Sequence, residues 1–305
     1  MEIVMKIFNA GMTIPALMGF CQRYPHHKPD VLLSYPLLPT IPRLFTHKHR
    51  HLIGGLFMDN GAFGANQPNS TLDADELYAK FKTYCEYSGK DWDLVFSFDR
   101  NFGLNGYAEN MEYQKELEQL GIPVVTTLHN IYNDDVDKII ARGLPEHKVV
   151  AIGQCDGREI YANIKDPVMK IYNAGGKVHF FGAINFDLFC RLPIYTCDAS
   201  SWSQYPAYGF VLYWNPKREK LNKTDKIYFP KLQEGTPPSG CQYYGTYGYL
   251  KDFKEYLQNN LGFGIDDLLG IEAEDNRRIA NILYYSQLEK IIEEKQLAHG
   301  FDTSD

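Results

Sequence analysis

The stretch Asp93-Leu94-Val95-Phe96-Ser97-Phe98-Asp99 decides the fold class, because it is a short apolar run that ends in a carboxylate. The same arrangement recurs at Leu56-Phe57-Met58-Asp59 and at Ile194-Tyr195-Thr196-Cys197-Asp198. A lone aspartate at a strand end is usually a turn residue or a helix cap. Several of them at strand and helix spacing indicate a barrel enzyme that gathers acidic groups around one pocket.

Eight short apolar or β-branched runs are spaced along the chain. They occupy 31–36, 53–58, 93–98, 123–128, 148–153, 177–182, 194–197 and 208–214. Helical patterns separate most of them, at 73–88, 109–120, 134–142 and 165–174, and the connection at 183–193 is short. Buried strands that alternate with amphipathic helices indicate a parallel sheet, and eight such units favour a closed barrel over an open sheet. We therefore predict an α/β protein with a (β/α)8 TIM barrel.

The 305 residues are predicted to form a single barrel domain. It would carry a Pro/Gly/Tyr-rich insertion at 215–245 and a C-terminal helical region at 250–305, with helices at 250–260 and 275–296. A composition that is 44% hydrophobic and 23% charged is that of an ordinary globular protein. The formal net charge of -7 argues against a general electrostatic binder of nucleic acid. Such a partner would be held by local basic segments, at 43–51 and 217–231, for which solvated loops are the alternative interpretation.

The six cysteines show no C-x-x-C pair and no metal-ligand spacing, so we expect reduced thiols and no metal site. No apolar stretch approaches the length of a membrane span, and the first residues lack the pattern of a signal peptide. We expect a cytoplasmic protein without a membrane partner, in the host cytoplasm if the chain is viral. No cofactor is implied, and a homodimer is left open.

Polar side chains at strand ends are expected to face one mouth of the barrel, because active sites of this fold lie at the carboxyl ends of the strands. They are Asp59, Asp99, His129, Gln154, His179 and Asp198.

Five segments carry a resemblance to one family. Asp59-Asn60-Gly61-Ala62-Phe63-Gly64 resembles the D-S-G-G-[FY]-Q motif of the tRNA-guanine transglycosylases. Four more follow in that family's order: Val95–Asp99, Ala151-Ile152-Gly153-Gln154 (like A-I-G-G), Val178–Gly182 (like M-G-V-G) and Thr196–Ser200 (like F-D-C-V). The resemblance covers roughly 50–215, and its strength lies in the order of the motifs.

The resemblance implies a covalent base exchange. It makes Asp198 the nucleophile and Asp59 the general acid and base, because cleaving an N-glycosidic bond calls for an attacking carboxylate and a second carboxyl that carries a proton. Asp99 would accept hydrogen bonds from the guanine edge, and Phe63 would stack on the base. The remaining base-binding residues would be Gly153, Gln154, His179 and Gly182, with His179 covering the other face of the base.

Departures from the family narrow the expected substrate. The zinc-binding C-x-C-x-x-C segment with its histidine is missing, and that subdomain helps to dock tRNA in the family. The sequence is therefore similar to the small viral branch that places 7-deazaguanine derivatives, of the preQ0 type, in DNA. DNA and the free deazaguanine base are the expected partners. The expected contacts to the nucleic-acid backbone are Arg43, Lys48, Arg50, Lys217 and Arg218.

Three alternatives stay open. A transglycosylase of this kind could act on tRNA. A barrel hydrolase could use His129 or the group His47, His49 and His51 as metal ligands, although those three lack strand character. A catalytically silent barrel that binds nucleic acid would have no need for both Asp59 and Asp198.

Overall fold

The computed structural model describes residues 5–38, 41–67, 69–103, 105–131, 133–153, 160–182, 184–231 and 238–301. Its backbone divides into two compact units, each built from separate stretches of sequence. The first unit contains Met1–Gly11, Asp30–Ala199 and Ile292–Asp305, and the second contains Met12–Pro29 and Ser200–Ile291. The assignment of 1–305 to a single domain stays a prediction.

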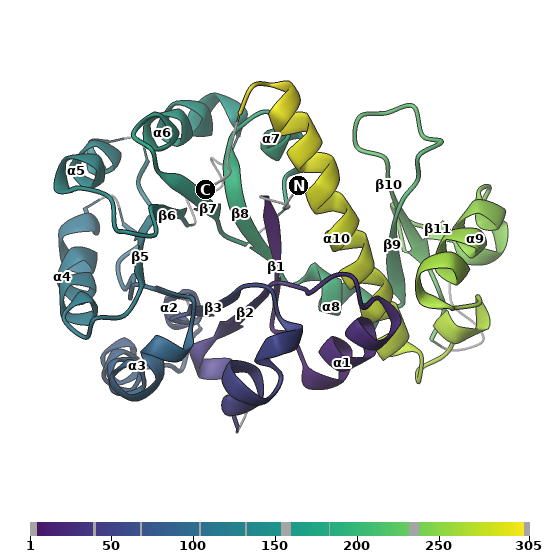
Figure 1. The fold of residues 1–305 in the computed structure, drawn as a ribbon, viewed down its shortest axis with the longest axis horizontal. Helices are drawn as coiled ribbons and strands as arrows, with labels where there is room; N and C mark the ends of the chain where they lie inside the picture. The colour runs from purple at the N-terminus through teal and green to yellow at the C-terminus, as the bar shows by residue number, and fades with distance from the viewer. Residues whose placement is uncertain are drawn as a thin grey trace. The chain divides into compact units, whose positions relative to one another are not determined.

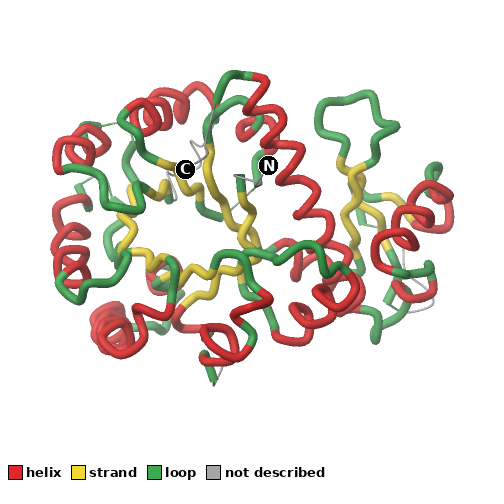
Figure 2. The backbone as a smooth tube through the Cα atoms, viewed as in Figure 1, coloured by secondary structure: helices red, strands yellow, loops and turns green. Residues whose placement is uncertain are grey.

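The first unit is a closed barrel of eight parallel strands, as predicted (Figures 1 and 2). The strands, in barrel order, are β1 (Lys6–Ala10), β2 (Val31–Ser34), β3 (Leu56–Asp59), β4 (Leu94–Phe96), β5 (Val124–Leu128), β6 (Val149–Ile152), β7 (Lys177–Phe180) and β8 (Ile194–Ala199). The barrel closes where β1 pairs with β8, with Phe8 opposite Asp198. The fold is thus an α/β TIM barrel, an architecture consistent with an enzyme.

One predicted barrel strand is wrong. The run at 208–214 corresponds to β9 (Phe210–Trp214), which pairs antiparallel with β10 (Thr224–Tyr228) in a separate three-stranded sheet. Its place in the barrel is taken by β1, whose sequence Lys-Ile-Phe-Asn-Ala was not predicted to be a strand. Both segments are short and buried, so hydrophobicity does not distinguish them, and pairing decides which one enters the barrel.

Helices surround the strands of the first unit (Figure 1). They are α2 (Ala62–Ala65), α3 (Ala74–Ser88), α4 (Tyr107–Glu118), α5 (Asp135–Arg142), α6 (Tyr161–Asn173) and α7 (Phe186–Phe189), with short helical turns at Tyr35–Leu37, Leu44–Lys48, Arg50–Leu52 and Gly89–Asp91. The start of α3 follows from the sequence, because the Asp73 carboxylate accepts hydrogen bonds from the amides of Asp75 and Glu76. The end of α5 follows likewise, because Gly143 takes a positive φ of 95°.

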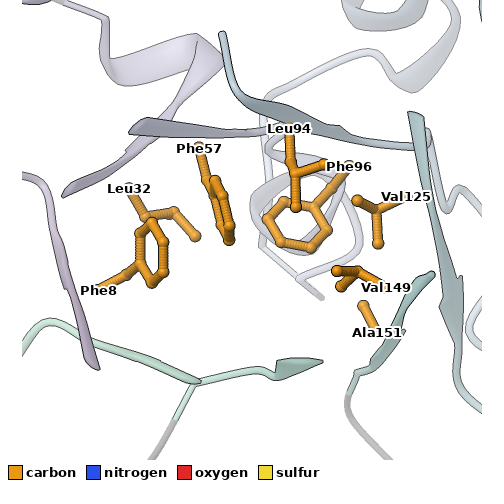
Figure 3. Packing of buried hydrophobic residues seen from close by; sticks show 8 residues of the cluster. All are labelled: Phe8, Leu32, Phe57, Leu94, Phe96, Val125, Val149 and Ala151. Atoms are coloured by element: carbon orange, nitrogen blue, oxygen red, sulfur yellow. The ribbon is translucent and has the colours of Figure 1, made fainter. Parts of the chain in front are cut away.

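Side chains fill the interior of the barrel, which is a packed core and not a pore. Eight buried residues from six strands converge there: Phe8, Leu32, Phe57, Leu94, Phe96, Val125, Val149 and Ala151 (Figure 3). The rings of Phe8 and Phe57 stack with centroids 3.8 Å apart. Side chains from β1 and β3 are therefore in contact inside the barrel, although β2 lies between these two strands. A core of this kind holds the strand ends rigidly, which fixes the side chains that follow them.

The second unit contains β9, β10 and β11 (Gln242–Tyr243) with the helices α1 (Ile14–Arg23), α8 (Ser201–Ala207), α9 (Leu250–Leu261) and most of α10 (Glu274–Ala298), and short turns at Tyr244–Thr246 and Asp266–Leu268. Asp225 organises its sheet. The carboxylate accepts hydrogen bonds from Asn215, Arg218 and Tyr247. The predicted helices at 250–260 and 275–296 are confirmed as α9 and α10.

The last turns of α10 belong to the first unit. There Gln296, almost fully buried, donates from Nε2 to the carbonyl oxygens of Phe189, Leu192 and Ile194 at 3.1, 2.9 and 2.9 Å. These carbonyls lie between the end of α7 and the start of β8. The side-chain amide of Gln296 therefore supplies hydrogen bonds to backbone carbonyls that would otherwise be buried without a partner.

Candidate active site

Three aspartates meet at the carboxyl ends of the barrel strands. Asp59 ends β3, Asp99 lies three residues beyond β4, and Asp198 lies in β8. The negative charges of Asp99 and Asp198 both raise the pKa of Asp59, so the three carboxyls share one electrostatic environment. The sequence predicted this convergence from strand-end positions alone.

Asp59 holds a proton near neutral pH. Its pKa is raised from 3.8 to about 7, first by burial and then by the charge of Asp99. Hydrogen bonds from the Ser34 hydroxyl and the Gly61 amide act in the opposite direction, and Asp198 adds a smaller rise. A carboxyl with such a pKa can both donate and accept a proton at physiological pH.

Asp99 is held from two sides. Its Oδ1 accepts a hydrogen bond from Asn60 Nδ2 at 2.9 Å, and its Oδ2 lies 2.7 Å from His129 Nε2. The Asp99 side chain is only 10% exposed. A carboxylate oxygen can accept more than one hydrogen bond, so each oxygen of Asp99 keeps a site for a ligand donor.

The loop after β3 is built around Asn60. This buried side chain donates to the Ser97 carbonyl at 2.6 Å and to Asp99, while its own oxygen accepts from the Ala62 amide at 2.6 Å. Gly61 follows with a positive φ of 80°, and a Cβ there would collide with the Pro36 ring. Asn60 and Gly61 therefore fix the turn that presents Phe63.

A row of aromatic rings leads from the surface to Asp99. Phe63 is 56% exposed and stacks with Phe102 at a centroid distance of 6.3 Å and an angle of 25°. Phe102 in turn stacks on His129 at 3.9 Å and 24°. Gly153 permits this position of His129, because a Cβ at 153 would lie 2.8 Å from the imidazole Nδ1.

Asp198 accepts a hydrogen bond on Oδ1 from the Gly182 amide at 2.9 Å. His179 lies beside it, with Nε2 3.6 Å from the same oxygen. Because His179 is 0% exposed and packs among aromatic rings, it has no surface on which a base could stack. The predicted role of His179 as a cover for the base is therefore corrected: the imidazole lies beneath Asp198, in the core.

A cavity of about 500 Å³ opens next to the aromatic row. Its lining comes from the turn after α2, the segment after β4 and the first turn of α4, namely Asn66, Gln67, Arg100, Asn101, Phe102, Gly103 and Glu109. Arg100 forms ion pairs with Asp75 and Glu109, which balance the positive charge of the guanidinium. The cavity is therefore polar without being strongly cationic.

The five predicted contacts to nucleic acid have different surroundings. Arg43 and Lys48 are exposed. Arg50 binds Asp93 through two hydrogen bonds of 2.9 and 2.7 Å, and Asp93 precedes β4, whereas Asp99 follows it. The structure thus places Arg50 at the opposite end of β4 from the aspartates.

Lys217 and Arg218 belong to the second unit. Lys217 pairs with Asp252 at 2.7 Å, and Arg218 pairs with the buried Asp225 at 2.9 Å. Arg218 therefore has a structural partner within its own sheet, whereas the Lys217 side chain is 57% exposed despite its ion pair.

Other expectations concern groups outside the aspartate site. In the described ranges, no three His, Cys, Asp or Glu side chains gather in a way that could hold a metal ion. Five described cysteines are free thiols, at positions 21, 85, 190, 197 and 241. Gln154 lies outside the described residues. None of the helices in the described part of the chain is long and apolar enough to cross a membrane.

Sequence reasoning did not assign roles to Asn60 and Phe102. Asn60 stood out only as a departure from the family motif, although an Asn before a glycine is a common turn signal. Phe102 lies in the segment Asp99-Arg100-Asn101-Phe102-Gly103, where an aromatic three residues after a strand-end aspartate was the available signal.

Comparisons with known proteins assign no family to the chain. No family model matches the sequence, and no curated protein matches it. Among solved structures, a crystal structure described as a candidate fructose-1,6-biphosphate aldolase from Coccidioides immitis aligns with a TM-score of 0.49 and 10% identity. The alignment covers 96% of this chain and 92% of that chain.

Proposed function

We propose that the protein is a base-exchange glycosyltransferase that replaces guanine in DNA with a 7-deazaguanine derivative of the preQ0 type. The observation that carries this proposal is the unequal aspartate pair at the barrel mouth. Burial and the charge of Asp99 raise the pKa of Asp59 to about 7, whereas Asp198 accepts a hydrogen bond from the Gly182 amide. Two carboxyls in different environments are the usual requirement for cleaving a glycosidic bond through a covalent intermediate.

The first half of the reaction cleaves the bond to guanine. Asp198 attacks the anomeric carbon, the C–N bond to guanine breaks with its electron pair remaining on the base, and Asp59 donates its proton to that base. The result is a glycosyl ester on Asp198 and an ionised Asp59. In the second half, the incoming base loses its proton to Asp59 and its nitrogen attacks the anomeric carbon, which releases the Asp198 carboxylate.

The surroundings of Asp99 support recognition of a flat base with N–H groups. Asn60 and His129 orient the carboxylate, and its remaining acceptor sites suit the ring N–H and the exocyclic amine of a guanine edge. Phe63 and Phe102 offer nearly parallel rings at the rim, on which a base outside the helix can stack. Gly153 lies against the His129 ring, and the Gly182 amide donates to Asp198.

The choice of DNA over tRNA rests on the sequence, in which the family's zinc-binding segment is missing. Exposed Arg43 and Lys48 are the proposed backbone contacts in the first unit, and Lys217 is the candidate in the second. With so few cations, the logarithm of the binding constant should fall with the logarithm of salt concentration at a slope of only about -2 to -3.

An exchange assay tests the function. Duplex DNA, single-stranded DNA and unmodified tRNA, each carrying labelled guanine, are incubated with the protein and free preQ0, and label release is followed. We expect release from DNA, loss of release in Asp198→Asn and Asp59→Asn, and unchanged release in the matched control Asp137→Asn, whose exposed carboxylate pairs with Lys170.

Each other outcome has a clear meaning. Incorporation into tRNA alone would replace the DNA assignment with a tRNA one. Release of guanine without incorporation of preQ0 would indicate a hydrolase. Full activity in Asp198→Asn would remove Asp198 from the chemistry, because an amide cannot replace the attacking carboxylate.

A further inference from the structure

His179 occupies an aromatic box inside the barrel. The imidazole lies 4.6 Å from the ring of Phe181 and 4.7 Å from that of Phe96, with Phe57 and Phe8 at 6.2 and 6.4 Å. It has no solvent exposure. The ring therefore has little room to rotate, and the directions of its two nitrogens are set by packing.

Within the described part of the chain, only one of these nitrogens has a hydrogen-bond partner. Nδ1 lies 2.9 Å from the Thr196 hydroxyl. Nε2 is buried without a hydrogen-bond partner among the described residues and points to Asp198 Oδ1 at 3.6 Å. Leaving a buried polar group unmatched destabilises the folded state, so an apolar residue would be more favourable here unless the nitrogen interacts with Asp198.

A second donor, the Gly182 amide, lies close to the same oxygen of Asp198. The Gly182 amide lies 2.9 Å from Asp198 Oδ1. Both donors therefore converge on Oδ1, and neither is directed at Oδ2. This asymmetry distinguishes the two oxygens of a carboxylate that would otherwise be equivalent.

We propose that His179 is a positioning residue that holds Asp198 Oδ1, so that Oδ2 is the oxygen that attacks the anomeric carbon. This inference rests on the proposed function for its chemical step. As the bond from Oδ2 to carbon forms, the C–N bond breaks, its electrons stay on the base, and the base takes the proton of Asp59. Oδ1 becomes the carbonyl oxygen of the ester, still held by Gly182 and by the N–H of His179.

The Thr196 hydroxyl suits this role, because it can donate to a neutral Nδ1 or accept from a protonated one. When the Thr196 hydroxyl donates to Nδ1, the hydrogen of the neutral ring lies on Nε2, which faces Asp198. The same contact also stabilises the carboxylate when the ester breaks in the second half of the reaction, so His179 acts on both steps through Asp198 and touches no substrate.

Two variants separate positioning from packing. His179→Gln keeps a nitrogen donor at about the position of Nε2, whereas His179→Met fills the volume without a donor. We expect His179→Met to lower kcat about 100-fold with KM within threefold, which is the usual effect of removing one preorganised donor. His179→Gln should recover at least tenfold of this loss. His147→Gln is the matched control, since His147 is a half-buried histidine bonded to Val124 O near the amino end of β5.

Two results would contradict the positioning role of His179. Activity of His179→Met near that of the wild type would overturn the proposal. If His179→Met and His179→Gln lose equal amounts of activity and equal free energy of unfolding, His179 is only a packing residue. That result would also overturn the proposal.

A measurement without substrate separates this inference from the proposed function. Nitrogen-15 NMR of histidine-labelled protein reports the protonation of each ring nitrogen. We expect a protonated Nε2 in His179 whose resonance shifts in Asp198→Asn. A shift in a protein that shows no base exchange would refute the glycosyltransferase and keep the pairing, whereas an unprotonated or unresponsive Nε2 would refute the pairing itself.

Discussion

Replacing Asp59 with asparagine is expected to stabilise the folded protein at pH 8 and to change its stability little at pH 4. The pKa of Asp59 is raised above its ordinary value, mainly by burial. Its contribution is therefore most favourable below pH 4 and is lost as the pH rises toward 7, because the unfolded chain ionises first. Asparagine does not ionise, so it avoids this loss.

The magnitude follows from the pKa. A rise from 3.8 to about 7 corresponds to about 4 kcal/mol at the conversion of roughly 1.4 kcal/mol for each pKa unit. Asp59 keeps some solvent contact, and screening reduces the cost of its charge, so we expect about 2 kcal/mol at pH 8. The difference between variant and wild type should grow between pH 4 and pH 7 and then stay constant.

Urea unfolding of both proteins at pH 4, 5.5, 7 and 8 measures this difference. Asp73→Asn serves as a control of opposite sign. The pKa of Asp73 is lowered by the amides of Glu76 and Asp75, so its stabilisation is present above pH 4 and lost as the pH falls. A difference for Asp59→Asn that does not depend on pH, or a destabilised variant at pH 8, would refute the assignment of a buried, neutral Asp59.

Three further predictions follow from the site and its support. Release of guanine should slow as the pH rises above about 7, because the proton on Asp59 is lost; a pH profile of the first half-reaction checks this, and a flat profile would exclude Asp59 as the acid. Gly153→Ala should displace His129 and lower exchange with little change in melting temperature, because its Cβ would crowd the imidazole; unaltered exchange would show that the position of His129 does not matter. Gln296→Leu should lower the free energy of unfolding by about 1–3 kcal/mol, since three buried carbonyls lose their donor, and an unchanged urea midpoint would contradict this.

The barrel was predictable because seven of its strands are apolar runs and helical patterns separate most of these runs. The error concerned the choice between Lys6–Ala10 and Phe210–Trp214 as a barrel strand. The second run looks more like a buried strand, but a partner at Thr224–Tyr228 directs it into another sheet. Pairing of this kind depends on contacts between residues distant in sequence, which local hydrophobicity does not encode.

The positions of the three aspartates were also predictable, because the carboxyl ends of parallel strands lie on the same side of a barrel. The environment of each aspartate could not be predicted from the sequence. Burial and the charge of Asp99 raise the pKa of Asp59, whereas a backbone amide supports Asp198. The place of His179 beside Asp198 depends on which face of β7 points inward, and the sequence Lys-Val-His-Phe, which is buried on both faces, does not determine it.

The pairing of β1 with β8 has a consequence for synthesis of the chain. Lys6 lies opposite Thr196, so the ring of strands cannot close until nearly two hundred residues have left the ribosome. Until then β1 exposes one free edge of the sheet and β7 exposes the other, in a state where unpaired strands can bind other chains. Contacts so distant in sequence also form slowly. The nascent chain therefore has a long window in which a chaperone that covers strand edges would increase the yield of folded protein.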